Sequence, residues 1–317
     1  MSWGKDRYCC VHDRRKALLA SNPDSYSVVI TETLWEISAE TKNKQENKQD
    51  QKKSRENHMF GRGDRRYPIP KTLEKLKEIN RQVSTDLGVE LDDILYVYID
   101  YDLSNQDPEF AYHGHPLDVI PFALTAIGGE HFGFLTDFGS IDDLEDAPIV
   151  FVQALPFEEY HVTLLANNII DFLGLFLSYR DLTSLFFSDD EPDIDDNTDP
   201  SEGPHLLYVK EKLIEGLGIS AKDPQKYRKD MLEKRSKEVA LQTINGIGIK
   251  RISSEELGPI YSIDLDVDYR ELINEVRRYF REASVENKLA CIVDLQETGV
   301  LTNHTKELNL NFESTTL

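Results

Sequence analysis

The sequence predicts an α+β fold in which an antiparallel sheet is flanked by helices and is followed by a C-terminal α/β segment. Short runs of β-branched and aromatic residues recur between residues 94 and 165, and glycine- or aspartate-rich turns separate them. Apolar residues at helical spacing precede and follow these runs. The chain has 317 residues, of which 39% are hydrophobic, so it is long enough to bury one or two modest cores.

The first element is an amphipathic helix that begins after Pro68 and Pro70. Its apolar residues are spaced by three, three, four and four positions, which places them on one helical face: Leu73, Leu76, Ile79, Val83 and Leu87. Gly88 follows the last of them and is expected to end the helix, because glycine adopts the left-handed conformation of a helix C-terminus without steric cost.

Five strands and a second helix complete this unit, which covers residues 71–187. The strands are expected at 94–99, 119–123, 133–136, 149–152 and 162–165. Asn167 or Asn168 then caps a strongly apolar helix that contains Ile169, Phe172 and Phe176. We expect Phe122, Phe132 and Phe134 to pack the sheet onto a helix.

The regions on either side have a different composition. Residues 1–70 form a poorly defined N-terminal region in which the polar stretch 41–57 is flexible, and residues 188–204 form an acidic linker. Residues 205–317 form a second α/β region with its own core. In that region we expect helices at 206–217, 224–243 and 272–280, period-two alternation at 260–267 and a last buried strand at 289–293.

The negative charge is concentrated in the middle of the chain. The whole protein has a formal net charge of −22, whereas residues 71–200 alone carry 5 Lys and Arg against 28 Asp and Glu, a net charge of −23. Between Arg81 and Lys210 the only such basic residue is Arg180. A nucleic-acid or anionic-membrane surface there is disfavoured because phosphate contacts need Lys and Arg. The field instead favours a basic protein partner.

The cysteine content and hydropathy predict a cytoplasmic protein that does not cross a membrane. The chain has three cysteines, two of them adjacent, so a disulfide scaffold is not expected. Its first residues lack the apolar segment of a secretory signal, and no apolar run reaches the length of a membrane-spanning helix.

The motifs that could indicate an enzyme are incomplete. Asp137-Phe138-Gly139 resembles the magnesium-binding tripeptide of protein kinases, but the other kinase motifs are absent, so we interpret it as a strand end entering a turn. The histidines His113, His115 and His131, together with Asp137, leave a metal-dependent hydrolase as a less favoured alternative. We therefore predict a non-enzymatic protein with no catalytic residues, no metal and no cofactor.

Residues 116–172 resemble the core of the SUKH superfamily. The resemblance consists of Ile120-Pro121-Phe122-Ala123, the turn Gly128-Gly129-Glu130-His131-Phe132, the strand end Phe134-Leu135-Thr136-Asp137 and the strand 149–152. That superfamily contains regulators of cell-wall glucan synthesis and bacterial immunity proteins that neutralise toxins. The resemblance implies a SUKH-like α+β domain with a binding function.

Together, the charge and the resemblance predict an immunity or antitoxin protein that occludes a basic toxin, for example a nuclease, with an acidic face. The alternative is a regulatory or scaffold module that binds a cellular protein. The candidate partner-binding residues are the carboxylates expected around two exposed turns: Glu130, Asp137, Asp142, Asp143, Glu145, Asp146, Glu158 and Glu159.

Overall fold

The computed structural model describes residues 67–103, 115–125, 129–153, 161–179 and 203–300. A five-stranded antiparallel sheet has its strands in chain order: β1 (Val97–Ile99), β2 (Val119–Thr125), β3 (His131–Leu135), β4 (Ile149–Val152) and β5 (Val162–Ala166). A two-stranded sheet pairs β6 (Val239–Leu241) with β7 (Ile249–Lys250). The predicted α+β fold class is confirmed.

The first predicted helix is α3 (Lys71–Leu87), and it buries the expected face. Gly88 ends it with a left-handed φ of 72°, as the sequence indicates. A second short helix, α4 (Leu91–Leu95), follows and occupies part of the region predicted as the first strand. The strand β1 is therefore shorter than expected.

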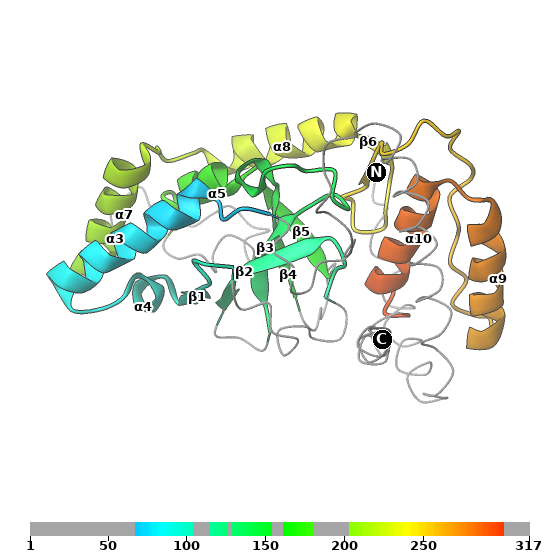
Figure 1. Ribbon diagram of the computed structural model, residues 1–317, viewed down its shortest axis with the longest axis horizontal. Helices are drawn as coiled ribbons and strands as arrows, with labels where there is room; N and C mark the ends of the chain where they lie inside the picture. Colours follow the sequence, from blue (N-terminus) through cyan, green and yellow to red (C-terminus); the bar gives the residue numbers. More distant parts are fainter. Residues whose placement is uncertain (1–66, 104–114, 126–128, 154–160, 180–202, 301–317) are drawn as a thin grey trace, which may run out of the picture.

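The main core lies between the sheet and the helices that Figure 1 shows along one side of it. The helix α5 (Ile169–Phe176) is capped by the Asn168 side chain, which accepts a hydrogen bond from the Asp171 amide. Phe172 of this helix lies 5.1 Å from Phe132 between ring centroids, and Phe122 and Phe134 are buried in the same cluster. The expected packing of the sheet onto a helix by these aromatic residues is thus confirmed.

Residues beyond position 203 also contribute to this main core. The helix α7 (Pro204–Leu217) buries Val209 and Leu213 completely against it. Its Gly216 lies so close to Ile79 of α3 that a Cβ would approach the Ile79 Cδ1 atom to 2.9 Å. The main core therefore draws on residues both before and after the predicted acidic linker.

A second core is formed by the last part of the described chain. It contains apolar residues of α9 (Tyr269–Glu282) and α10 (Val285–Glu297) together with Leu241 and Ile249 from the small sheet. The helix α8 (Pro224–Glu238) leads into β6, so the predicted helix at 224–243 ends five residues early. None of the helices in the described ranges is long and apolar enough to cross a membrane.

Two expectations about the C-terminal region require correction. The predicted strand at 289–293 is part of α10, which begins at a capping serine, Ser284, whose side chain accepts the Asn287 amide. A short apolar run does not distinguish a buried strand from a buried helix. Residues 260–267 form no strand pairing, although Tyr261, Ile263, Leu265 and Val267 pack alternately on the second core.

Candidate functional site

Three of the predicted binding carboxylates are exposed on one turn between β3 and β4. Asp142, Asp143 and Asp146 lie in or beside a single 3-10 turn, Leu144–Asp146, and Glu145 between them is half-buried. The Asp143 carboxylate accepts a hydrogen bond of 3.0 Å from the Glu145 amide. The turn is therefore held in a defined conformation and presents aspartates to solvent.

Glu145 anchors this turn to α3. Its carboxylate accepts hydrogen bonds from the Thr72 amide, at 3.1 Å, and from the Thr72 hydroxyl. Thr72 lies in the first turn of the helix, where backbone amides have no partner within the helix. Glu145 thus acts as a remote cap, and its role is to position the aspartates beside it.

Asp137 was predicted to be an exposed contact, and the structure corrects this. Its side chain is 4% exposed and forms a bidentate pair with Arg235 of α8, with N–O distances of 2.6 and 3.0 Å. Lys250 of β7 lies 3.1 Å from the same carboxylate. Arg235 also donates to the carbonyls of Ile247 and Gly248. Asp137 therefore joins parts of the fold and is not available to a partner.

The turn that contains Asp137 has an unusual backbone. Asp137, Phe138 and Gly139 have φ angles of 47°, 54° and 80°, so three consecutive residues are left-handed. Such angles are unfavourable for the two residues that have a Cβ atom. The interpretation of this tripeptide as a strand end entering a turn is confirmed, and the buried ion pair holds that turn in place.

The structure does not show the other predicted carboxylates as exposed partner-binding residues. Glu130 is half-buried, and its burial raises the pKa of its carboxyl group. Glu158 and Glu159 lie outside the described residues, as does His113 of the metal-site alternative.

The remaining histidines of that alternative contact each other. The His115 Nδ1 and His131 Nε2 atoms are 3.1 Å apart, while the outer ring nitrogens lie 3.0 Å from the Val119 carbonyl and 2.9 Å from the Gly129 carbonyl. Two neutral imidazoles have only two N–H groups for these three contacts. Burial lowers the pKa of His131. Among the described residues, no group of three or more His, Cys, Asp or Glu side chains is arranged to hold a metal ion.

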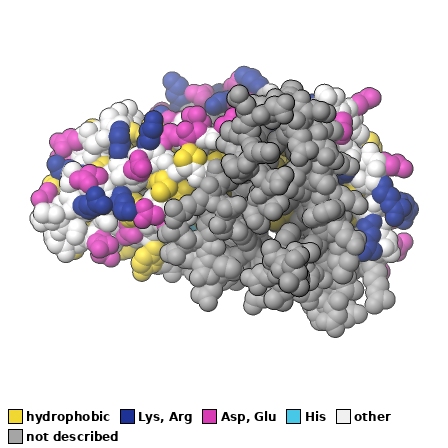
Figure 2. All heavy atoms as spheres, in the orientation of Figure 1, with side chains coloured by type: hydrophobic (Ala, Val, Ile, Leu, Met, Phe, Trp, Pro, Cys, Tyr) yellow, Lys and Arg dark blue, Asp and Glu magenta, His cyan; other side chains and the backbone are white. Residues whose placement is uncertain are grey.

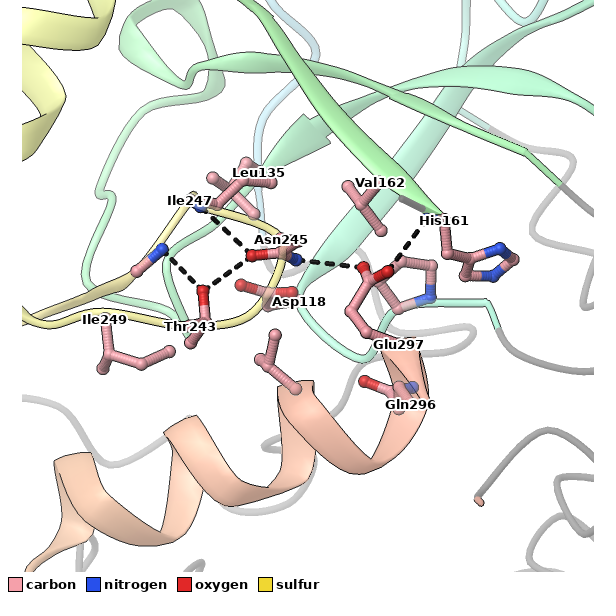
Figure 3. Close-up of a pocket in the computed structure, with 13 residues that line it drawn as sticks. Asp118, Leu135, His161, Val162, Thr243, Asn245, Ile247, Ile249, Gln296 and Glu297 are labelled. Carbon is pink, nitrogen blue, oxygen red and sulfur yellow. Dashed lines mark hydrogen bonds between the residues drawn. The ribbon is translucent and has the colours of Figure 1, made fainter. Parts of the chain in front are cut away.

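A small cavity lies where the C-terminal region meets the open face of the sheet (Figure 3). Its volume of about 20 Å³ is sufficient for a water molecule but not for a substrate. Ile247, in the turn between β6 and β7, packs there against Val119, Leu135 and Val162 of the sheet. The Glu297 carboxylate accepts hydrogen bonds from the Asn245 side chain, at 3.0 Å, and from the His161 amide, at 2.8 Å.

Carboxyl groups in and beside this cavity have raised pKa values. Burial raises the pKa of Glu297 to about 7 and that of Asp294 to about 6. The pKa of Asp118 is raised to about 7 by burial and by the neighbouring Asp137 carboxylate. The pKa values of these groups lie near neutral pH. The two carboxyl groups on α10 also accept hydrogen bonds from backbone amides of other elements: Asp294 from the Ile244 amide and Glu297 from the His161 amide. Their arrangement is suited to joining the sheet to the C-terminal region.

Sequence reasoning missed one surface feature, the exposure of Tyr96 and Tyr98 at β1. The expected strand at 94–99 contains both, but its composition alone does not indicate which side faces solvent. The alternation of tyrosine with Val97 between flanking aspartates was a signal that could have indicated their exposure.

No protein-family model and no curated protein matches this chain.

Proposed function

We propose that the protein is a non-enzymatic binding protein that covers a basic protein partner with an acidic surface, as an immunity or antitoxin protein does. The observation that supports this most directly is the exposure of Asp142, Asp143 and Asp146 on a turn that Glu145 anchors to α3. Because that turn is already ordered, binding loses little conformational entropy there.

The charge around this turn supports a basic partner. In the described part of residues 71–200, 16 Asp and Glu residues accompany only 4 Lys and Arg residues. Such an excess accelerates and orients the approach of a positively charged protein, and it repels nucleic acid. An inhibitor of a nuclease would benefit from both effects, since the substrate-binding cleft of a nuclease is basic.

The resemblance of residues 116–172 to the SUKH core fits both the immunity role and the alternative of a regulatory or scaffold module, because that superfamily contains regulators as well as immunity proteins. The two roles predict different outcomes for the partner. An immunity protein abolishes its partner's activity, whereas a scaffold leaves it intact.

The hydrolase alternative is less well supported by the contacts of its residues. Asp137 is occupied by Arg235 and Lys250, and the facing nitrogens of His115 and His131 contact each other. A metal ion would have to displace these contacts before it could bind.

The proposal can be tested with the protein encoded by the neighbouring gene, prepared as an inactive variant and titrated calorimetrically at about 50 and 300 mM salt. The Asp142→Lys/Asp146→Lys variant is expected to lose at least about tenfold in affinity at low salt. A matched control, Glu211→Lys/Asp230→Lys, changes the net charge equally at exposed positions of α7 and α8.

Equal losses in the two variants would show that only the net charge matters and would contradict a specific acidic surface. An activity assay of the active partner then separates the two roles, because inhibition supports immunity and unchanged activity supports a scaffold.

A further inference from the structure

Tyr96 and Tyr98 are the most exposed large hydrophobic side chains that the structure describes. They are 69% and 66% exposed, whereas the next such residues reach 46%. Val97 between them is buried, as expected where side chains alternate along an extended strand. Tyrosine is enriched at the energetic centres of protein interfaces, so two adjacent exposed tyrosines indicate a binding surface.

The fold fixes both tyrosines. Tyr96 ends α4 in the left-handed conformation, with a φ of 57°, and its amide donates to the Asp92 carbonyl. Tyr98 is paired with Leu124 in the register of β1 and β2. Their backbones are therefore ordered before any partner binds.

A hollow lies beside Tyr98 on these two strands. It has a volume of about 340 Å³ and is lined by Tyr98, Ile99, Asp100, Pro121, Phe122, Leu124 and Thr125. Since a water molecule occupies about 30 Å³, this space accommodates a long side chain. Its lining combines an aromatic ring, apolar groups and one carboxylate.

The surroundings of the hollow favour a cation. Residues 86–102 contain six carboxylates and no Lys or Arg: Asp86, Glu90, Asp92, Asp93, Asp100 and Asp102. Lys77 of α3 pairs with Asp102, at 2.7 Å, which leaves an acidic excess around the hollow. Figure 2 shows hydrophobic and acidic side chains beside each other, with Lys or Arg side chains next to them, in the part of the molecule where α4 and β1 lie. A guanidinium group stacks on an aromatic ring and pairs with a carboxylate, so arginine fits this combination.

The edge of β1 is less suited to recognition by strand addition. Asp92 accepts hydrogen bonds from the Ile99 amide, at 3.0 Å, and from the Tyr101 hydroxyl, at 2.6 Å. The Asp92 carboxylate thus occupies an edge amide that an added strand would need. Recognition here must therefore depend on side chains.

We propose that Tyr98 and Asp100 form a docking site for an arginine side chain of a basic protein, with Tyr96 exposed two residues before Tyr98. The guanidinium stacks on the Tyr98 ring in the hollow, and Asp100 lies at its charged end. This inference depends on the proposed function only for the basic character of the partner, because the site does not include the Asp142–Asp146 turn.

The test is an NMR titration of the isotope-labelled full chain with a peptide of alternating glycine and arginine. The largest amide shifts are expected at residues 96–100 and 121–125. The Tyr98→Ala variant is expected to bind at least about threefold more weakly, whereas Tyr98→Phe retains the ring and the affinity. The matched control Leu232→Ala removes an exposed apolar side chain of α8 and is expected to change nothing. A lysine peptide is expected to bind more weakly than the arginine peptide.

Thermal melts of each variant establish that it is folded. The docking site is refuted if folded Tyr98→Ala binds like the wild type, if its loss equals that of Leu232→Ala, or if the peptide does not bind. If Asp142→Lys/Asp146→Lys alone weakens binding of the basic partner protein, the proposed function stands and this site fails. If Tyr98→Ala alone weakens binding of the basic partner protein, the docking site is supported and the role of the turn is contradicted.

Discussion

Arg235 of α8 and Asp137 in the turn after β3 form a buried bidentate ion pair, although they are 98 residues apart in the sequence. Phe138, next to Asp137, packs on the second core, whereas Phe134, three residues before Asp137, lies in the main core. The ion pair therefore lies where the sheet meets the C-terminal region and fixes how the two cores are arranged.

The first prediction concerns this pair. Arg235→Met leaves the Asp137 carboxylate buried with Lys250 as its remaining cationic partner, and we expect a loss of about 3 kcal/mol in the free energy of unfolding. Urea unfolding measures this loss. The exposed pair Lys237–Glu233 provides the control, because Lys237→Met should change stability by less than about 1 kcal/mol. Similar losses in both variants would contradict a special role for the buried pair.

The second prediction is a pH dependence centred on Glu297. Its pKa is about 7 in the folded protein against 4.5 ordinarily, so folding takes up a proton between these values. The resulting stability is fully present below about pH 4.5 and is lost as the pH rises through 7, an effect of order 3 kcal/mol. Thermal melts should therefore show that Glu297→Gln is less sensitive than the wild type between about pH 5 and pH 8.

His131 acts in the opposite direction and must be considered in this experiment. Its pKa is lowered by burial, so the stability it contributes is present above its ordinary value of 6.5 and is lost as the pH falls through the folded pKa. The comparison between Glu297→Gln and the wild type removes this background because both proteins contain His131. Identical pH profiles would show that Glu297 does not titrate in this range.

Local features of the fold were predictable from the sequence, and distant partnerships were not. The face of α3 and the Asn168 cap of α5 depend on residues within a few positions of one another, so spacing and residue type indicate them. The burial of Asp137 depends on its pairing with Arg235, and no residue near Asp137 in the sequence indicates that pairing. The charge of the turn at Asp142 was visible, but the anchoring role of Glu145 depends on Thr72, 73 residues earlier.

The third prediction tests the packing of β3 against β2. A Cβ added to Gly133 would lie 2.3 Å from the Val119 Cγ1 atom and 3.1 Å from the Ile120 carbonyl oxygen. Gly133→Ala therefore requires the strands to shift, and we expect a loss of about 1 to 3 kcal/mol in chemical denaturation. Gly203→Ala is the control, because a Cβ there has no neighbour within 4 Å. Since Gly203 is the N-cap of α7, where glycine is preferred to alanine, this variant should lose less than about 1 kcal/mol. An unchanged Gly133→Ala midpoint would contradict the close approach of these strands.

The last prediction separates the structural and binding roles of the acidic turn. Glu145→Ala removes the acceptor of the Thr72 amide at the start of α3, and we expect a loss of about 1 to 2 kcal/mol together with faster hydrogen exchange in the first turn of that helix. Asp146→Ala removes an exposed carboxylate one residue away and should leave exchange in α3 unchanged. Affinity for a basic partner should respond differently from hydrogen exchange, because both variants are expected to bind more weakly. Asp146 contributes its charge directly to binding, whereas Glu145 also determines where the turn lies. Equal exchange at Thr72 in the two variants would contradict the capping role of Glu145, and the order of the turn would then need another cause.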